Sequence, residues 1–281
     1  MTDTQHTPRA AARAIMRDSL PAEQWARNEA FTERLKATIT GHRLYTHPIL
    51  AAWERNEFTL ESLRFVHLEV RAGFLELFME SLLRLMQTTT QLERDLGPKA
   101  KVAARFLIQL NVLDELGFVP GGSEAEGFQG SPDQAHYWQL MEALVALGAP
   151  PETWWDSPMS PEAQASHAIL AENQDDHLRL ASVLATIETV FMPFYDPWAR
   201  NTVHVCGDVA ARSAYHTIHV ENDDGHFVDD EHSEDSWYVV RQALTDERRD
   251  EVETLIGEAL DTWAALMDLF MRHNRELRQA A

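Results

Sequence analysis

Residues 219–226 read HVENDDGH, and the rest of the chain is best interpreted from this stretch. In a helix, His219, Asp223 and His226 would stand at positions i, i+4 and i+7, which share one face. Two imidazoles and a carboxylate converging from one helix can bind iron, manganese or zinc. The same residues would also suit a solvated acidic helix end, so the decision depends on whether other parts of the chain supply further ligands.

The composition indicates an ordinary folded protein with an acidic balance. The chain has 281 residues, 44% of them hydrophobic and 25% charged, with a net charge of −21. This charge argues against nucleic acid, which is bound through clustered Lys and Arg, and it weakens binding to anionic membranes. We find no apolar run that approaches the ~20 residues needed to span a bilayer. Residues 1–17 lack the apolar core of a signal peptide, so we expect a cytoplasmic protein.

Apolar residues recur at helical spacing through most of the chain, whereas strand-like alternation is scarce. Thr59 and Ser160 are suitable N-caps, and Gly117 follows the end of a helix as a C-cap. We therefore expect one all-α domain of seven or eight helices over residues 21–281, preceded by a loosely held arm over residues 1–20. The expected helices cover residues 22–40, 59–85, 99–116, 134–147, 177–194, 208–228 and 237–272, with one more after Ser160 and a break near residues 245–246.

Three ionisable residues fall on helix faces that should be buried. Glu188 shares a face with Leu184 and Phe191, Glu115 lies at the end of its helix, and His136 precedes an apolar stripe. A carboxylate without a partner in a core costs several kcal/mol, so such residues normally have one. Each alone is compatible with an Arg-paired Glu or a hydrogen-bonded core His.

With residues 219–226, these positions provide three carboxylates and three histidines. Such a set suits two divalent metals in a helical bundle, with bridging carboxylates and histidines completing each coordination sphere. Two divalent ions bring four positive charges against three negative ones, which leaves the site close to neutral. The expected metal ligands are Glu115, His136, Glu188, His219, Asp223 and His226.

The order of these residues resembles the haem-oxygenase-like diiron oxidase and oxygenase superfamily. The similar segments are NVLDELG (residues 111–117), His136 leading into MEALVALG (141–148), then Glu188 and His219-x3-Asp223-x2-His226. The family order is Glu, His, Glu, then His-x3-Asp/Glu-x2-His. The link between the first two ligands is longer here than the family's short glycine-rich one, and Asp114 is an alternative to Glu115.

The resemblance implies a haem-oxygenase-like bundle that holds two Fe(II) ions and uses O2 as co-substrate. Relatives oxygenate amine nitrogens, cleave or desaturate amino acids, or decarboxylate fatty acids, usually in natural-product biosynthesis. We take N-oxygenation of an amine-type nitrogen first, because an acidic protein suits a basic substrate. Tyr215 and Arg212, one and two turns before His219, are candidate substrate contacts. Manganese in place of one iron and a homodimer both stay open.

The helix carrying the last three ligands should depend on the metal. Asn222, Asp223, Asp224 and Gly225 are poor helix formers, and Gly225 alone costs ~1 kcal/mol relative to Ala. Because coordination energy becomes folding energy, we expect this helix to fray without metal and to order on binding.

Three other functions compete with this interpretation. The first is a metal-free enzyme of the same fold, either a cofactorless oxidase or a hydrolase, and the hydrolase would need a nucleophile such as Cys206, the chain's one cysteine. A non-enzymatic metal-binding protein would need only the acidic residues. A haem protein would use a histidine near the chain's start, such as His42 or His47, but would not need three buried carboxylates.

Overall fold

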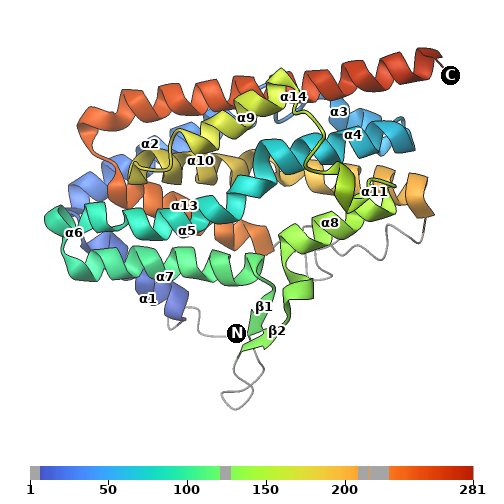
Figure 1. Cartoon of the computed structure of the whole chain (residues 1–281). Helices are drawn as coiled ribbons and strands as arrows, with labels where there is room; N and C mark the ends of the chain where they lie inside the picture. Colours follow the sequence, from blue (N-terminus) through green and yellow to red (C-terminus); the bar gives the residue numbers. More distant parts are fainter. Residues whose placement is uncertain (1–6, 121–127, 208–214, 216–227, 281) are drawn as a thin grey trace, which may run out of the picture.

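The computed structural model describes residues 7–120, 128–207, 215 and 228–280, and most of these are helical. The expected all-α class is confirmed (Figure 1). The described residues form thirteen α-helical segments, more than the seven or eight expected, because several are short and one long helix is interrupted. The segments are α1 (Pro8–Asp18), α2 (Ala22–Gly41), α3 (Pro48–Glu54), α4 (Leu60–Val70), α5 (Glu76–Thr88), α6 (Thr90–Leu96), α7 (Pro98–Glu115), α8 (His136–Ala146), α9 (Pro161–Ala171), α10 (His177–Val190), α11 (Tyr195–Cys206), α13 (Val228–Ala243) and α14 (Arg249–Ala280).

Helix α10 lies at the centre of the bundle. It packs against α2, α5, α13 and α14, and twelve of its fourteen residues are buried. The long helix α14 runs along the edge that is uppermost in Figure 1, with α9 beside it, and α7 packs between α5 and α1. The expected break near residues 245–246 is confirmed, since α13 ends at Ala243 and α14 begins at Arg249.

The N-terminal arm that we expected is a packed helix over Pro8–Asp18. Thr7 caps it by accepting a hydrogen bond from Ala10 N, and Pro8 occupies the first helical position. Its Met16 is fully buried, and the guanidinium of Arg13 lies 2.6 Å from the Asp235 carboxylate on α13. Although this segment is rich in Ala and Arg, one narrow face of α1 is apolar, and α7 and α13 pack against the helix.

The helix expected over residues 59–85 is interrupted by a π-helical turn. Thr59 caps α4 as expected, α4 continues into the π turn η2 (Arg71–Leu75), and α5 follows without a break. Gly73 lies in this turn, and a side chain there would be 3.3 Å from the Ala163 carbonyl oxygen of α9. Turns of this kind change which residues face the interior, and they are frequent at functional sites.

The region around Cys206 is helical, although we expected a connection. Helix α10 ends at Val190, and α11 follows after one 3₁₀ turn with Pro197 in its first turn, where the missing N–H is tolerated. Among the described residues, the stretch His177–Cys206 is long and apolar enough to span a membrane, contrary to our expectation. However, 67% of its apolar window is buried inside the protein, as in the core helix of a bundle.

Two buried histidines should make stability depend on pH. Burial lowers the pKa of His67 to about 4 and that of His177 to about 4, although each imidazole has a hydrogen-bonding partner, Leu63 O and Thr88 Oγ1 respectively. In the unfolded chain both titrate near pH ~6.5. Between about pH 6.5 and 4 the unfolded state therefore binds more protons, and the free energy of unfolding falls as the pH falls.

We predict that His67→Phe reduces the slope of unfolding free energy against pH by about 0.7 kcal/mol per pH unit near pH 6.5, rising to about 1.4 near pH 5. Urea unfolding at several pH values measures this slope. The control His204→Phe replaces a histidine that is exposed in the folded protein, so its slope should equal that of the wild type. An unchanged slope for His67→Phe would show that this imidazole is not held neutral by burial.

Candidate metal centre

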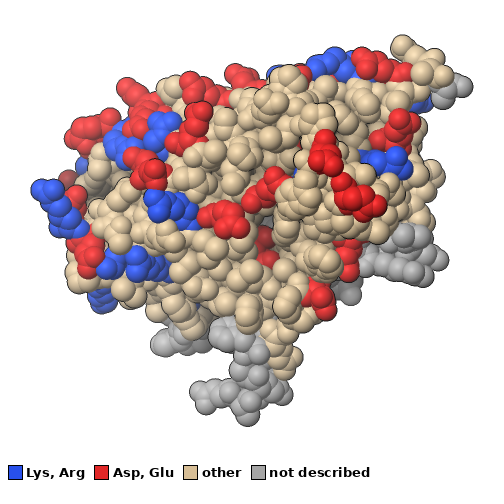
Figure 2. Space-filling model, viewed as in Figure 1, with Lys and Arg blue, Asp and Glu red and all other residues tan. Residues whose placement is uncertain are grey.

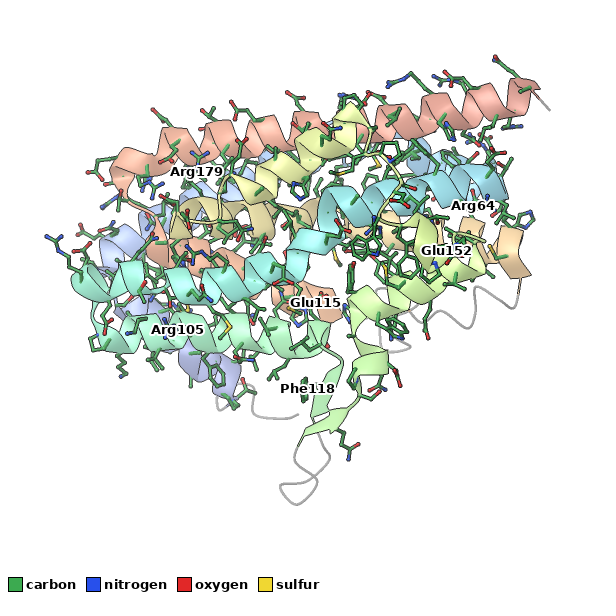
Figure 3. The ribbon with its side chains drawn as sticks, in the orientation of Figure 1. Arg64, Arg105, Glu115, Phe118, Glu152 and Arg179 are labelled. Atoms are coloured by element: carbon green, nitrogen blue, oxygen red, sulfur yellow. The ribbon has the colours of Figure 1, made fainter. Side chains whose placement is uncertain are left out.

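A β-hairpin brings the end of α7 next to the start of α8. Strand β1 (Phe118–Pro120) pairs antiparallel with β2 (Phe128–Gly130), so the chain returns to α7 before α8 begins. Glu115 ends α7 and His136 begins α8, and the Glu115 Oε2 atom lies 3.2 Å from His136 Nδ1. Figure 3 labels Glu115 at this end of α7. The link that is long in sequence therefore does not separate the two candidate ligands.

Two glycines with positive φ form the base of this hairpin. Gly117 has φ +77°, and a Cβ there would lie 2.5 Å from the backbone carbonyl carbon of Gln134. Gly130 has φ +103°, and a Cβ there would overlap the carbonyl oxygen of Gly117. Only glycine adopts this conformation without cost and leaves room for the neighbouring backbone of the same hairpin. The closeness of Glu115 and His136 therefore depends on two residues that have no side chain.

Glu188 is the one acidic residue of α10 and lies in the bundle interior. Only 9% of it is exposed, and its Oε1 accepts a hydrogen bond of 3.0 Å from Asn111 Nδ2 on α7. A buried carboxylate needs such donors or a cation, because transfer from water strongly disfavours its charged form. The amide of Asn111 thus orients the Glu188 carboxylate and partly compensates its charge.

One cavity of about 510 Å³ joins three of the predicted ligands. Glu115, His136 and Glu188 all line it, and so does Tyr215, a predicted substrate contact. Tyr215 is buried and packs edge-on against Trp198, with ring centres 6.0 Å apart. The other predicted site residues, His219, Asp223, His226 and Arg212, lie outside the described residues.

Glu115 and His136 are spaced as two ligands of one metal ion would be. Adjacent ligands that each lie about 2.1 Å from one ion are about 3 Å from each other, close to the observed 3.2 Å. In the part of the chain that the structure describes, however, no group of three His, Cys, Asp or Glu side chains is close enough to hold an ion. Glu115 and His136 therefore have the spacing of two ligands in a partial set, and the predicted ligands His219, Asp223 and His226 lie outside the described residues.

Asp114, the alternative first ligand, lies on the other side of the His136 ring. Its Oδ2 atom is 3.9 Å from His136 Nε2 and 3.9 Å from Nδ1 of His232. His232 is buried on α13, and our sequence interpretation missed it because we placed residues 228–236 between two helices. His232 and the buried Asp235 are three residues apart, a spacing that places both on one face of a helix and could have indicated this helix.

The other candidate nucleophile and haem ligands have structural surroundings. Cys206 ends α11, and burial raises the pKa of its thiol, which lowers the fraction present as the nucleophilic thiolate. His47 caps α3 by accepting a hydrogen bond from Ile49 N, and its Nε2 lies 3.1 Å from Asp268. His42 lies 3.3 Å from Asp261. These contacts count against hydrolysis through Cys206 and against either histidine as a haem ligand.

No protein-family model matches the chain, and a search of curated proteins finds no significant match. Function must therefore be inferred from the residues and their geometry.

We predict that Gly130→Ala lowers the free energy of unfolding by at least about 1–3 kcal/mol, the usual cost of a strained φ at a residue with a side chain, because the overlap with the Gly117 carbonyl oxygen adds to that strain. Urea unfolding measures the change. The control Gly257→Ala lies in the middle of α14 with no atom within 4 Å of the added methyl, so it should raise stability by up to about 1 kcal/mol. Equal effects of the two substitutions would contradict the proposed constraint on the hairpin.

The Asn111–Glu188 hydrogen bond can be tested with a double-mutant cycle. In protein treated with a chelator, Asn111→Leu should cost about 1.5–3 kcal/mol, because a buried carboxylate loses a donor while the number and branching of the side-chain heavy atoms are kept. In a Glu188→Leu background the same substitution should cost much less, giving a coupling energy of about 1 kcal/mol or more in urea unfolding. Additive effects would show that the two side chains do not depend on each other.

Proposed function

We propose that the protein is a non-haem diiron oxidase or oxygenase with a haem-oxygenase-like bundle, which activates O2 and acts on a small molecule. The observation that carries this proposal is that Glu115, His136 and Glu188, from three different helices, line the same apolar cavity. Two carboxylates and an imidazole in the interior of a bundle are the donors that diiron carboxylate proteins use. The sequence motif at residues 219–226 would supply the rest.

In such a site the described residues would have three roles: binding the metal, orienting a ligand and excluding water. Glu115 and His136 would hold one side of the metal centre, and Glu188, oriented by Asn111, would hold another. When bound, a pair of ferrous ions would supply the electrons that reduce O2. The walls of the cavity are mainly aromatic and aliphatic side chains, which exclude water from the bound substrate.

The charges around the cavity support a substrate that contains an amine. Besides the candidate ligands Glu115 and Glu188, two further glutamates line it, Glu76 and Glu80, and no Lys or Arg does among the described residues. We therefore place N-oxygenation of an amine-type nitrogen first. Oxidative C–C cleavage, desaturation or decarboxylation of an amino acid or fatty acid at the same site is the alternative.

The test is anaerobic loading of the full chain with Fe(II), followed by metal analysis and then O2 exposure with a panel of amines, amino acids and fatty acids. We expect about two irons per chain and O2 uptake that depends on both iron and an amine. Glu115→Ala, His136→Ala and Glu188→Ala should each lose at least about half of the bound iron, because each removes a direct ligand.

Glu142→Ala is the matched control, since Glu142 is an exposed carboxylate on α8. It should keep the wild-type iron content and O2 uptake. Full iron content in all three ligand variants, with circular dichroism showing that they are folded, would contradict the proposal. Bound iron without O2 uptake for any compound would leave a metal-binding protein rather than an oxygenase.

A further inference from the structure

The cavity has an inner end and a rim with different chemistry. Its buried lining residues include His136, Glu188 and Tyr215, which mark the inner end. Other lining residues are open to solvent and mark the rim: Trp138 is 47% exposed, and Trp155 is 71% exposed. A substrate that enters past Trp138 or Trp155 would contact aromatic side chains before it reaches the candidate ligands.

The wall between these two ends is apolar. The helix that contains the π turn contributes successive rows of side chains to it, among them Val66, Val70, Phe74 and Phe78, which are four residues apart. Phe191, which also lines the cavity, packs edge-on against Phe74, with ring centres 5.3 Å apart. Cavities of this volume and lining bind drug-sized molecules mainly through apolar contact. The body of the ligand should therefore be hydrocarbon or aromatic.

Ionised side chains at the rim carry a net negative charge. Glu76 lines the cavity and is ion-paired with the buried Arg71, whose Nη2 also donates to the Trp154 carbonyl oxygen at 2.5 Å. Glu80, one turn after Glu76, is exposed and lines the cavity too. Arg71 thus compensates one of the two carboxylates and leaves the charge of Glu80.

Figure 2 shows the same bias on the surface. Acidic atoms lie beside and within a hollow near the centre of this face, whereas the basic atoms gather toward the left of the view and at its upper right. An anionic group entering here would meet like charge, while a cation would meet charge of opposite sign.

From these observations we infer that the cavity takes an amphiphilic amine, with an apolar body between the aromatic walls and a protonated amine at the rim beside Glu80. The inference deepens the proposed function. It rests on that function only for the metal-dependent reaction at the inner end, and not for amine binding at the rim. A molecule with a protonated amine for the rim, an apolar spacer, and a second, uncharged nitrogen for the inner end would suit both ends of the cavity.

Calorimetric titration of the full chain tests this, using three probes with the same apolar body: 4-phenylbutylamine, 4-phenylbutanol and 4-phenylbutanoate. Titrations are run under anaerobic conditions, with a chelator and separately with Fe(II). We expect the amine to bind at least about tenfold more tightly than the carboxylate in both conditions. Glu80→Gln should weaken amine binding about two- to fivefold, the range for an exposed ion pair, and leave the alcohol unchanged.

Two further variants locate the binding. Glu61→Gln removes an exposed carboxylate on the preceding helix α4, outside the cavity lining, and should change none of the three affinities. Met79→Trp adds volume at a half-buried lining position and should weaken all three probes while the chain stays folded by circular dichroism.

Carboxylate binding as tight as that of the amine, or equal losses for amine and alcohol in Glu80→Gln, would overturn the inference. Neither readout needs iron or O2 turnover. A chain that selects the amine but binds no iron would therefore support the inference and contradict the proposed function. A chain that binds iron and consumes O2 but does not select the amine would support the proposed function and contradict the inference.

Discussion

The structure depends on compensating charge that is buried in the middle of the bundle. Glu188 lies on α10, where twelve of the fourteen residues are buried. Buried helix positions of this kind are usually occupied by apolar side chains. Asn111 Nδ2 donates a hydrogen bond of 3.0 Å to Glu188, and this donor is a neutral amide. A divalent cation compensates a buried carboxylate much more strongly, which is why Glu188 is the residue that most clearly suggests a metal.

The same constraint explains the arrangement around Glu188. Glu115 and His136 reach the same cavity because a hairpin with two obligatory glycines closes the long link between their helices. The π turn lets one long helix line the cavity from its inner end to its rim. The apolar walls then make each charged group at either end selective, because little else in the cavity can bind a polar ligand.

Much of the fold could be predicted from the sequence, because its helices have strong apolar periodicity and local caps. The N-caps Thr59 and Ser160 both form as expected, and α2, α7 and α10 begin within one residue of the expected positions. For the site, the burial of Glu188 and His136 followed from their places on apolar faces.

Other features could not be predicted because they depend on tertiary contacts. The hairpin has strands of three residues, too short for a clear alternating pattern in the sequence. The apolar stripe of α1 is narrow and becomes apparent only when α7 covers it. His232 and Asp114 are 118 residues apart in the sequence (232 − 114), and they approach each other only because α7 and α13 pack together.

The most direct test of the central claim is a crystal structure of the full chain grown anaerobically with Fe(II), with anomalous scattering to locate the iron. The account predicts iron about 2.1 Å from donor atoms of Glu115, His136 and Glu188, with His219, Asp223 and His226 completing the coordination. Iron bound elsewhere, with Glu188 still held by Asn111 and no metal in the cavity, would contradict it.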